Sequence, residues 1–129
     1  MTQRVLLRQA LTKVFPTLST TELQTLTNRM EKASFPPGTK IFQQGEQGDS
    51  LYVVVDGSVQ IRYYLEMGQP RDILLANLGA ASLFGEMSLF GDHLRSASAV
   101  CATTVTLYRF SREDLAKQPP EIMGLDSQM

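Results

Sequence analysis

The chain has 129 residues, with 12 Lys and Arg against 13 Asp and Glu and a sequence pI near 5.8. This length predicts a single domain over 1–129, and the balanced charge excludes the basic field by which proteins bind nucleic acids or anionic membranes. The single cysteine, Cys101, excludes an internal disulfide and with the single histidine, His93, cannot form a structural zinc site, so a reducing cytoplasm is expected.

Two helices are expected first, within about 3–33. Apolar residues follow helical spacing up to Phe15-Pro16, which stops the first helix. This pattern is not the apolar block of a signal peptide, and no stretch of the chain approaches the roughly 20 apolar residues of a membrane span. Ser19-Thr-Thr-Glu22 is typical of a capping box and predicts a second helix that ends near Ala33. Its buried stripe is expected to carry Leu23, Leu26 and Met30.

From Lys40 the pattern changes to short strands bounded by glycine-bearing turns, which predicts a β-roll over about 35–110. Asp56-Gly57 separates two of these strands and predicts a hairpin between them. Further strands are expected over 71–78 and 98–110. Several short antiparallel strands at this spacing predict a mainly β fold, a sandwich or jelly roll.

After the roll, Ser111-Arg-Glu-Asp-Leu115 is typical of a capped helix start, and Pro119-Pro120 interrupts it. The sequence therefore predicts a short C-terminal helix within 111–129.

The run from Leu83 to Val100 carries groups suited to a sugar phosphate. Gly85 permits a close approach of backbone to ligand, and 86–89 can form one helical turn whose free N–H groups attract an anion. Arg95 supplies a charged fork for phosphate oxygens. Glu86 would repel phosphate, so it is useful there only if the same ligand donates hydrogen bonds to it, as ribose hydroxyls do.

This run resembles the phosphate-binding cassette of cyclic nucleotide-binding domains. The signature is Phe-Gly-Glu, an aliphatic residue, Ala or Ser, Leu, a short loop, then Arg, Ser/Thr/Ala, Ala and Ser/Thr, and residues 84–89 and 95–98 fit it. The resemblance covers about residues 5–118. The chain departs from the family at Leu94, where many members carry Pro, at Ala99, where a β-branched residue is preferred, and at Ala80-Ala81-Ser82, where members usually have a Gly and an Asp.

The resemblance implies an antiparallel jelly roll (double-stranded β-helix) that binds cAMP or cGMP, with cAMP favoured. Arg95 and backbone N–H groups would hold the cyclic phosphate, and Glu86 would accept a hydrogen bond from the ribose 2′-hydroxyl. Ile61, Leu75 and Ala76 fall where the family lines its base pocket, although plain core packing would select the same residues. The implied ligand-binding residues are Gly85, Glu86, Met87, Arg95, Ser96, Ala97, Ile61, Leu75 and Ala76.

The function expected is that of a regulatory module that relays binding to an effector domain of a longer protein. Leu89 and Leu115 resemble the pair that carries the signal to the hinge, and the base-capping residue is expected beyond Met129. Neither a catalytic residue nor a cofactor is expected. Two alternatives remain. A metal-dependent jelly-roll enzyme would need clustered histidines, and the chain has one. A roll that serves for docking, or senses another ligand such as haem, would bind no cyclic nucleotide.

Overall fold

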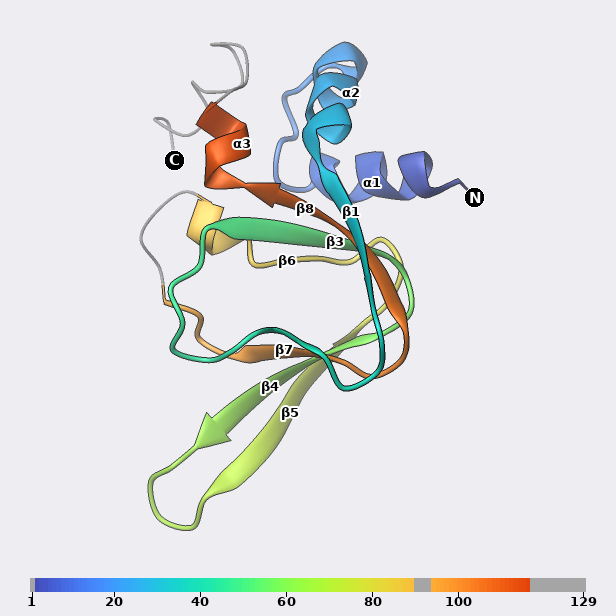
Figure 1. Cartoon of the computed structure of the whole chain (residues 1–129). Helices are drawn as coiled ribbons and strands as arrows, with labels where there is room; N and C mark the ends of the chain where they lie inside the picture. The colour runs from blue at the N-terminus through green and yellow to red at the C-terminus, as the bar shows by residue number, and fades with distance from the viewer. Residues whose placement is uncertain (1, 90–93, 117–129) are drawn as a thin grey trace.

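Two four-stranded antiparallel sheets form the body of the protein (Figure 1). The computed structural model describes residues 2–89 and 94–116. Across the first sheet the strands follow the order β1 (Glu31–Phe35), β8 (Val105–Ser111), β3 (Ser50–Asp56) and β6 (Leu83–Phe84). Across the second they follow the order β2 (Lys40–Phe42), β7 (Ser98–Cys101), β4 (Val59–Leu65) and β5 (Arg71–Leu78). The predicted mainly β, antiparallel class is confirmed.

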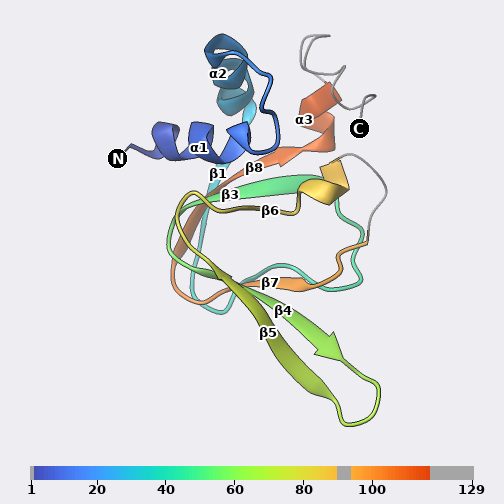
Figure 2. The same cartoon turned by 180° about the vertical axis from the view of Figure 1, so that it is seen from behind.

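Three helices lie at one end of the molecule, over the first sheet, and the β4–β5 hairpin projects from the opposite end in both views (Figures 1 and 2). They are α1 (Gln3–Thr12), α2 (Thr20–Arg29) and α3 (Arg112–Ala116), with the single turn of 3-10 helix η1 (Glu86–Leu89) beside β6. In the described part of the chain, no helix has the length and apolar character needed to cross a membrane.

The predicted capping box starts α2. The Glu22 N–H donates to Ser19 Oγ at 3.1 Å, and the Ser19 N–H donates to Glu22 Oε1 at 2.9 Å. Leu23, Leu26 and Met30 are buried as expected.

The predicted end of α2 near Ala33 is wrong. The helix ends at Arg29, Met30 is extended, and Glu31 to Phe35 form β1, which pairs with β8 from Glu31 opposite Arg109 to Phe35 opposite Val105. No residue of β1 is fully buried, so its sequence carries no clear strand alternation, and only the distant partner strand determines its structure.

The strand β3 is covered on both faces, which explains its continuous apolar sequence. Val53 and Val55 pack in one core with α1 and α2, whereas Val54 packs in a second core between the two sheets. Alternate side chains of a strand point to opposite faces, so the middle of a strand between two layers carries apolar residues in succession. The first residue of this strand, Ser50, also accepts a hydrogen bond from the side chain of Arg95.

The predicted hairpin at Asp56-Gly57 is also wrong. The strands on either side of it, β3 and β4, belong to different sheets, and β4 pairs with β5 and β7. The turn therefore passes the chain from one sheet to the other. Gly57 has φ +93°, and a Cβ there would collide with the carbonyl oxygen of Thr104. Glycine is required by this crossing, and not by a two-residue hairpin loop.

Candidate functional site

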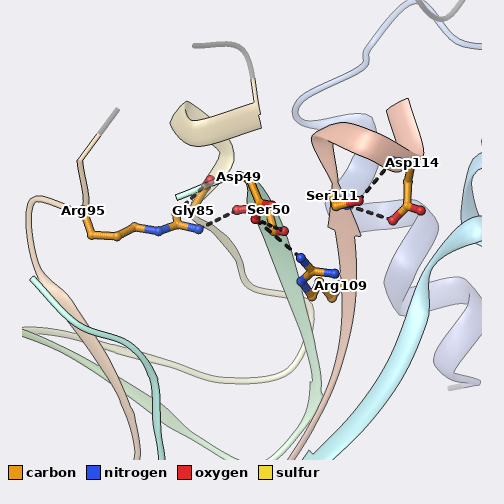
Figure 3. Close-up of polar contacts among 7 residues, drawn as sticks. All are labelled: Asp49, Ser50, Gly85, Arg95, Arg109, Ser111 and Asp114. Carbon is orange, nitrogen blue, oxygen red and sulfur yellow. Dashed lines mark hydrogen bonds and ion pairs between the residues drawn. The ribbon is translucent and has the colours of Figure 1, made fainter. Parts of the chain in front are cut away.

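The guanidinium of Arg95 is the centre of the candidate site. The residue is only 7% exposed, and it donates from Nη2 to the Ser50 carbonyl at 2.9 Å and from Nη1 to the Gly85 carbonyl at 3.2 Å (Figure 3). Its central carbon lies 4.1 Å from the ring centroid of Phe42 and 5.8 Å from that of Tyr52. Arg95 is therefore a buried, bonded arginine and not a solvated surface residue.

The Nε–H of Arg95 is a buried donor that the described part of the protein leaves unpaired. Nε is buried and has no hydrogen-bond partner within residues 2–89 and 94–116. Burial lowers the pKa of Arg95, while Tyr52, Asp49 and Glu46 raise it and so favour the charged form. A buried charged group with an unpaired N–H costs roughly 1–3 kcal/mol, and a ligand acceptor would remove this cost.

Gly85 lies against the arginine and needs to be glycine. Its φ is +81°, and a Cβ at this position would stand 2.8 Å from Arg95 Nη1 and 3.0 Å from the Ser50 carbonyl oxygen. The helical turn predicted after it is present as η1, so the chain passes from β6 through Gly85 into this turn.

A cavity of about 300 Å³ brings most of the predicted residues together. Its lining includes Gly85, Glu86, Met87, Arg95, Ser96, Ala97 and Ile61 from the prediction, and also Phe42, Leu83, Phe84 and Leu94. Leu75 and Ala76 are outside this lining. Ala76 is paired with Ile61 across β4 and β5, whereas Leu75 is 56% exposed on β5.

Phe42 is the lining residue that the sequence did not single out. It enters the cavity because β2 pairs with β7, which puts Phe42 opposite Ala99, just after the cassette. A strand of three residues carries too little pattern to predict its partner, so no signal in the sequence alone would have identified it.

A polar chain runs from the cavity to α3. The Ser50 hydroxyl donates to Asp49 Oδ1 at 2.8 Å, and the Arg112 N–H donates to the Asp49 carbonyl at 2.7 Å. At the start of α3 the Asp114 N–H donates to Ser111 Oγ and the Ser111 N–H donates to Asp114 Oδ2, both at 3.0 Å (Figure 3). The capped helix start predicted at Ser111 is confirmed.

Three residues considered in the sequence lie outside what the structure describes. They are His93 and the side chains of Leu89 and Leu115.

A larger depression of about 500 Å³ lies elsewhere on the second sheet, lined in part by Lys40, Gln44, Arg62, Tyr64 and Asp72. Arg62 pairs with Asp72 at 3.4 Å, and the Gln44 amide bonds the backbone of Tyr64 in both directions. The charged and amide groups of these two pairs already have partners within the protein, whereas Arg95 Nε has none among the described residues. The smaller cavity around Arg95 is therefore the better candidate for a ligand site.

Known proteins similar to this chain have the fold that the sequence and the structure indicate. The family profile described as cyclic nucleotide-binding domain matches residues 32–118. The chain is 38% identical over 101 residues to the cyclic AMP receptor protein of Thermus thermophilus, covering 78% of this chain and 46% of the relative. It is 32% identical over 111 residues to the cGMP-dependent protein kinase egl-4 of Caenorhabditis elegans, covering 83% of this chain and 14% of the relative.

Among solved structures, the N-terminal domain of a transcriptional regulator from Streptomyces coelicolor A3(2) matches with a TM-score of 0.81 at 28% identity, over 95% of this chain and 87% of that one. This likeness confirms the predicted jelly roll. The chain spans less than half the length of both curated relatives.

Proposed function

This chain belongs to the cyclic nucleotide-binding domain family, and we propose that it is a regulatory module that reversibly binds a cyclic nucleotide in the cavity around Arg95. The observation that carries the proposal is the buried guanidinium with its unpaired Nε–H. Because its other nitrogens are already bonded to carbonyls of the protein, the arginine is held in place before a ligand arrives. Such preorganisation lowers the ordering cost of binding.

In this proposal each part of the ligand meets a different group. The cyclic phosphate is held by Arg95 and by backbone N–H groups at Gly85 to Met87, Ser96 and Ala97. Glu86, which lines the same cavity, accepts a hydrogen bond from the ribose 2′-hydroxyl. Several charge-assisted hydrogen bonds of about 1.5–3 kcal/mol each support micromolar affinity.

We propose cAMP as the preferred nucleotide. The relative with 38% identity is named as a cyclic AMP receptor, whereas the one with 32% identity is a cGMP-dependent kinase. The base would lie near Ile61, and Leu75 and Ala76 would line its pocket from the neighbouring strand.

The output of binding would pass to an effector domain of a longer cytoplasmic protein. The polar contacts from Ser50 through Asp49 to the first residue of α3 supply a path from the cavity to the helical end. Arg95 is bonded to the backbone carbonyl of Ser50, the residue whose hydroxyl begins this path, so a ligand bound to Arg95 would shift the population of α3 positions. No catalytic role is proposed for this chain.

Calorimetric titration with cAMP and with cGMP tests the proposal. The wild type is expected to bind cAMP more tightly than cGMP, and Arg95→Ala is expected to lose detectable binding. Arg62→Ala is the matched control, because the Arg62 side chain also makes a hydrogen bond within the protein but is outside the cavity lining. Arg95→Lys keeps the charge and serves if Arg95→Ala does not fold. Absence of binding of both nucleotides at millimolar concentration would favour a docking role, and retained affinity in the arginine variants would remove the site assignment.

A further inference from the structure

Three aromatic rings from three different strands gather beside Arg95. Phe42 comes from β2, Tyr52 from β3 and Phe84 from β6, with ring centroids 5.8 Å apart for Phe42–Tyr52, 5.8 Å for Phe42–Phe84 and 5.3 Å for Tyr52–Phe84. Of these rings, Phe42 is the nearest to the guanidinium, with 4.1 Å from its centroid to the central carbon. Phe42 and Arg95 both line the cavity.

The contacts of the guanidinium divide between its edge and its face. At the edge, the two terminal nitrogens are occupied by the carbonyls of Ser50 and Gly85. On the face, the Phe42 ring lies at the distance of a cation–π contact. Two hydrogen bonds and one stacked ring together fix the position and the tilt of the planar group. Nε is the nitrogen of the group that makes no hydrogen bond within the described residues, and its N–H is therefore available to a ligand.

We propose that Phe42 is a positioning residue for this site: its ring holds the Arg95 guanidinium so that the unpaired Nε–H meets the ligand. The inference rests on the proposed function, because the acceptor is the phosphate of the cyclic nucleotide. Phe42 acts on the ligand through Arg95, so its own apolar contact with the nucleotide is not required.

An aromatic ring is needed here and an apolar side chain of similar volume is not equivalent. The negative face of the ring attracts a cation, and this attraction grows when water is excluded. Leucine would fill the space without that attraction, so the guanidinium would move and take up water. The arginine would then have to be ordered again when the ligand binds.

The test compares the wild type with Phe42→Leu, Phe42→Tyr and Phe35→Leu. Tyrosine keeps the aromatic face, and Phe35→Leu makes the same substitution in the same core cluster at a residue outside the cavity lining. Two quantities are measured: cAMP affinity by calorimetry, and the rate of exchange of the Arg95 Nε–H with water by NMR of the free protein.

Phe42→Leu is expected to weaken cAMP binding about 3- to 30-fold and to accelerate the Nε–H exchange. Phe42→Tyr and Phe35→Leu are expected to stay within about two-fold of the wild type in both measurements. Equal affinity and exchange in Phe42→Leu and the wild type, or equal loss in Phe42→Tyr and Phe42→Leu, would overturn the inference. If the wild type binds neither nucleotide, the proposed function and the binding part of this inference fail together. The exchange rate then still decides whether Phe42 positions Arg95.

Discussion

The side chain of Arg95 donates a hydrogen bond to the backbone carbonyl of Ser50, a residue 45 positions earlier in the chain. Ser50 is the first residue of β3, and it stands between the cavity and the polar contacts that lead to α3. The segment that carries Arg95 is therefore attached to β3, an inner strand of the first sheet, through the Arg95 side chain. A change that displaces Arg95 therefore acts directly on the start of β3.

Replacing Glu86 by Gln is expected to weaken cAMP binding by about 5- to 30-fold, because a charged acceptor of the ribose 2′-hydroxyl becomes a neutral one. The measurement is calorimetry with cAMP and with 2′-deoxy-cAMP. The two proteins are expected to differ far less with the deoxy ligand, which lacks the hydroxyl. Glu66→Gln, an exposed residue outside the cavity lining, is the control. An equal loss with both ligands would contradict the ribose role.

Gly85→Ala is expected to reduce both stability and binding. The new Cβ would press on Arg95 Nη1 and on the Ser50 carbonyl in a left-handed backbone conformation. Unfolding in urea is expected to show a loss of about 1–3 kcal/mol, and cAMP affinity is expected to fall more than about 10-fold. Gly68→Ala is the control because Gly68 has φ +73° with nothing within 4 Å of a Cβ, so it has the strain without the collision. Normal affinity in Gly85→Ala would show that Arg95 tolerates displacement.

Ala81→Gly is expected to stabilise the protein. Ala81 has φ +69°, the only positive φ at a residue other than glycine within the described ranges, and its N–H donates to the Val54 carbonyl at 2.8 Å. Removing the left-handed strain raises the free energy of unfolding by about 1–2 kcal/mol. The greater backbone entropy of glycine in the unfolded state lowers it by about 0.5–1 kcal/mol. Chemical denaturation is expected to show a net gain near 0.5–1 kcal/mol. Ala80→Gly, without a positive φ, is expected to lose stability, and an equal gain there would contradict the explanation.

Gly57→Ala is expected to destabilise the fold by at least about 2 kcal/mol while leaving cAMP affinity unchanged in the folded protein. The reason is the collision with the Thr104 carbonyl where the chain crosses between sheets, far from the cavity lining. Thermal unfolding and calorimetry below the transition separate the two effects. Gly38→Ala, with φ +87° and open space around a Cβ, should lose less stability. Equal losses at both positions would show that strain alone matters at Gly57.

Alkaline pH is expected to weaken the fold through Cys101. Burial raises the pKa of its thiol above the usual 9.0, and the side chain is 2% exposed. The unfolded state then loses the thiol proton first, so the contribution is intact below pH 9 and falls by up to about 1.4 kcal/mol per pH unit above it. Urea unfolding from pH 7 to 10 measures this. The difference in unfolding free energy between the wild type and Cys101→Ala is expected to shrink as the pH rises. A constant difference would exclude ionisation of the thiol as the cause of the loss.

Features with a local cause were predicted from the sequence. The capping boxes at Ser19 and Ser111 need only two residues three positions apart, and both are present. The helical turn after Gly85 and the strand over 71–78 likewise follow from short patterns. The buried Arg95 was found by its spacing from Phe-Gly-Glu, a motif that the resemblance supplied.

Features that depend on distant partners could not be predicted in this way. The crossing at Gly57 has the same residues as a hairpin turn, and only the pairing of β3 with β8 decides between them. The strand β1 takes its structure from residues more than 70 positions later, as the Ser34–Thr106 hydroxyl pair illustrates with a separation of 72. Phe42 entered the site through the pairing of β2 with β7.

The position of β8 between β1 and β3 has a consequence for biosynthesis. The first sheet cannot close before residue 111 has left the ribosome, because its inner strand β8, Val105–Ser111, is synthesised after the other strands of the described residues. Until then β1 and β3 have open edges, which favour aggregation. The first sheet is therefore completed only after β8 has been made, and a stall before residue 105 releases a product that lacks this inner strand.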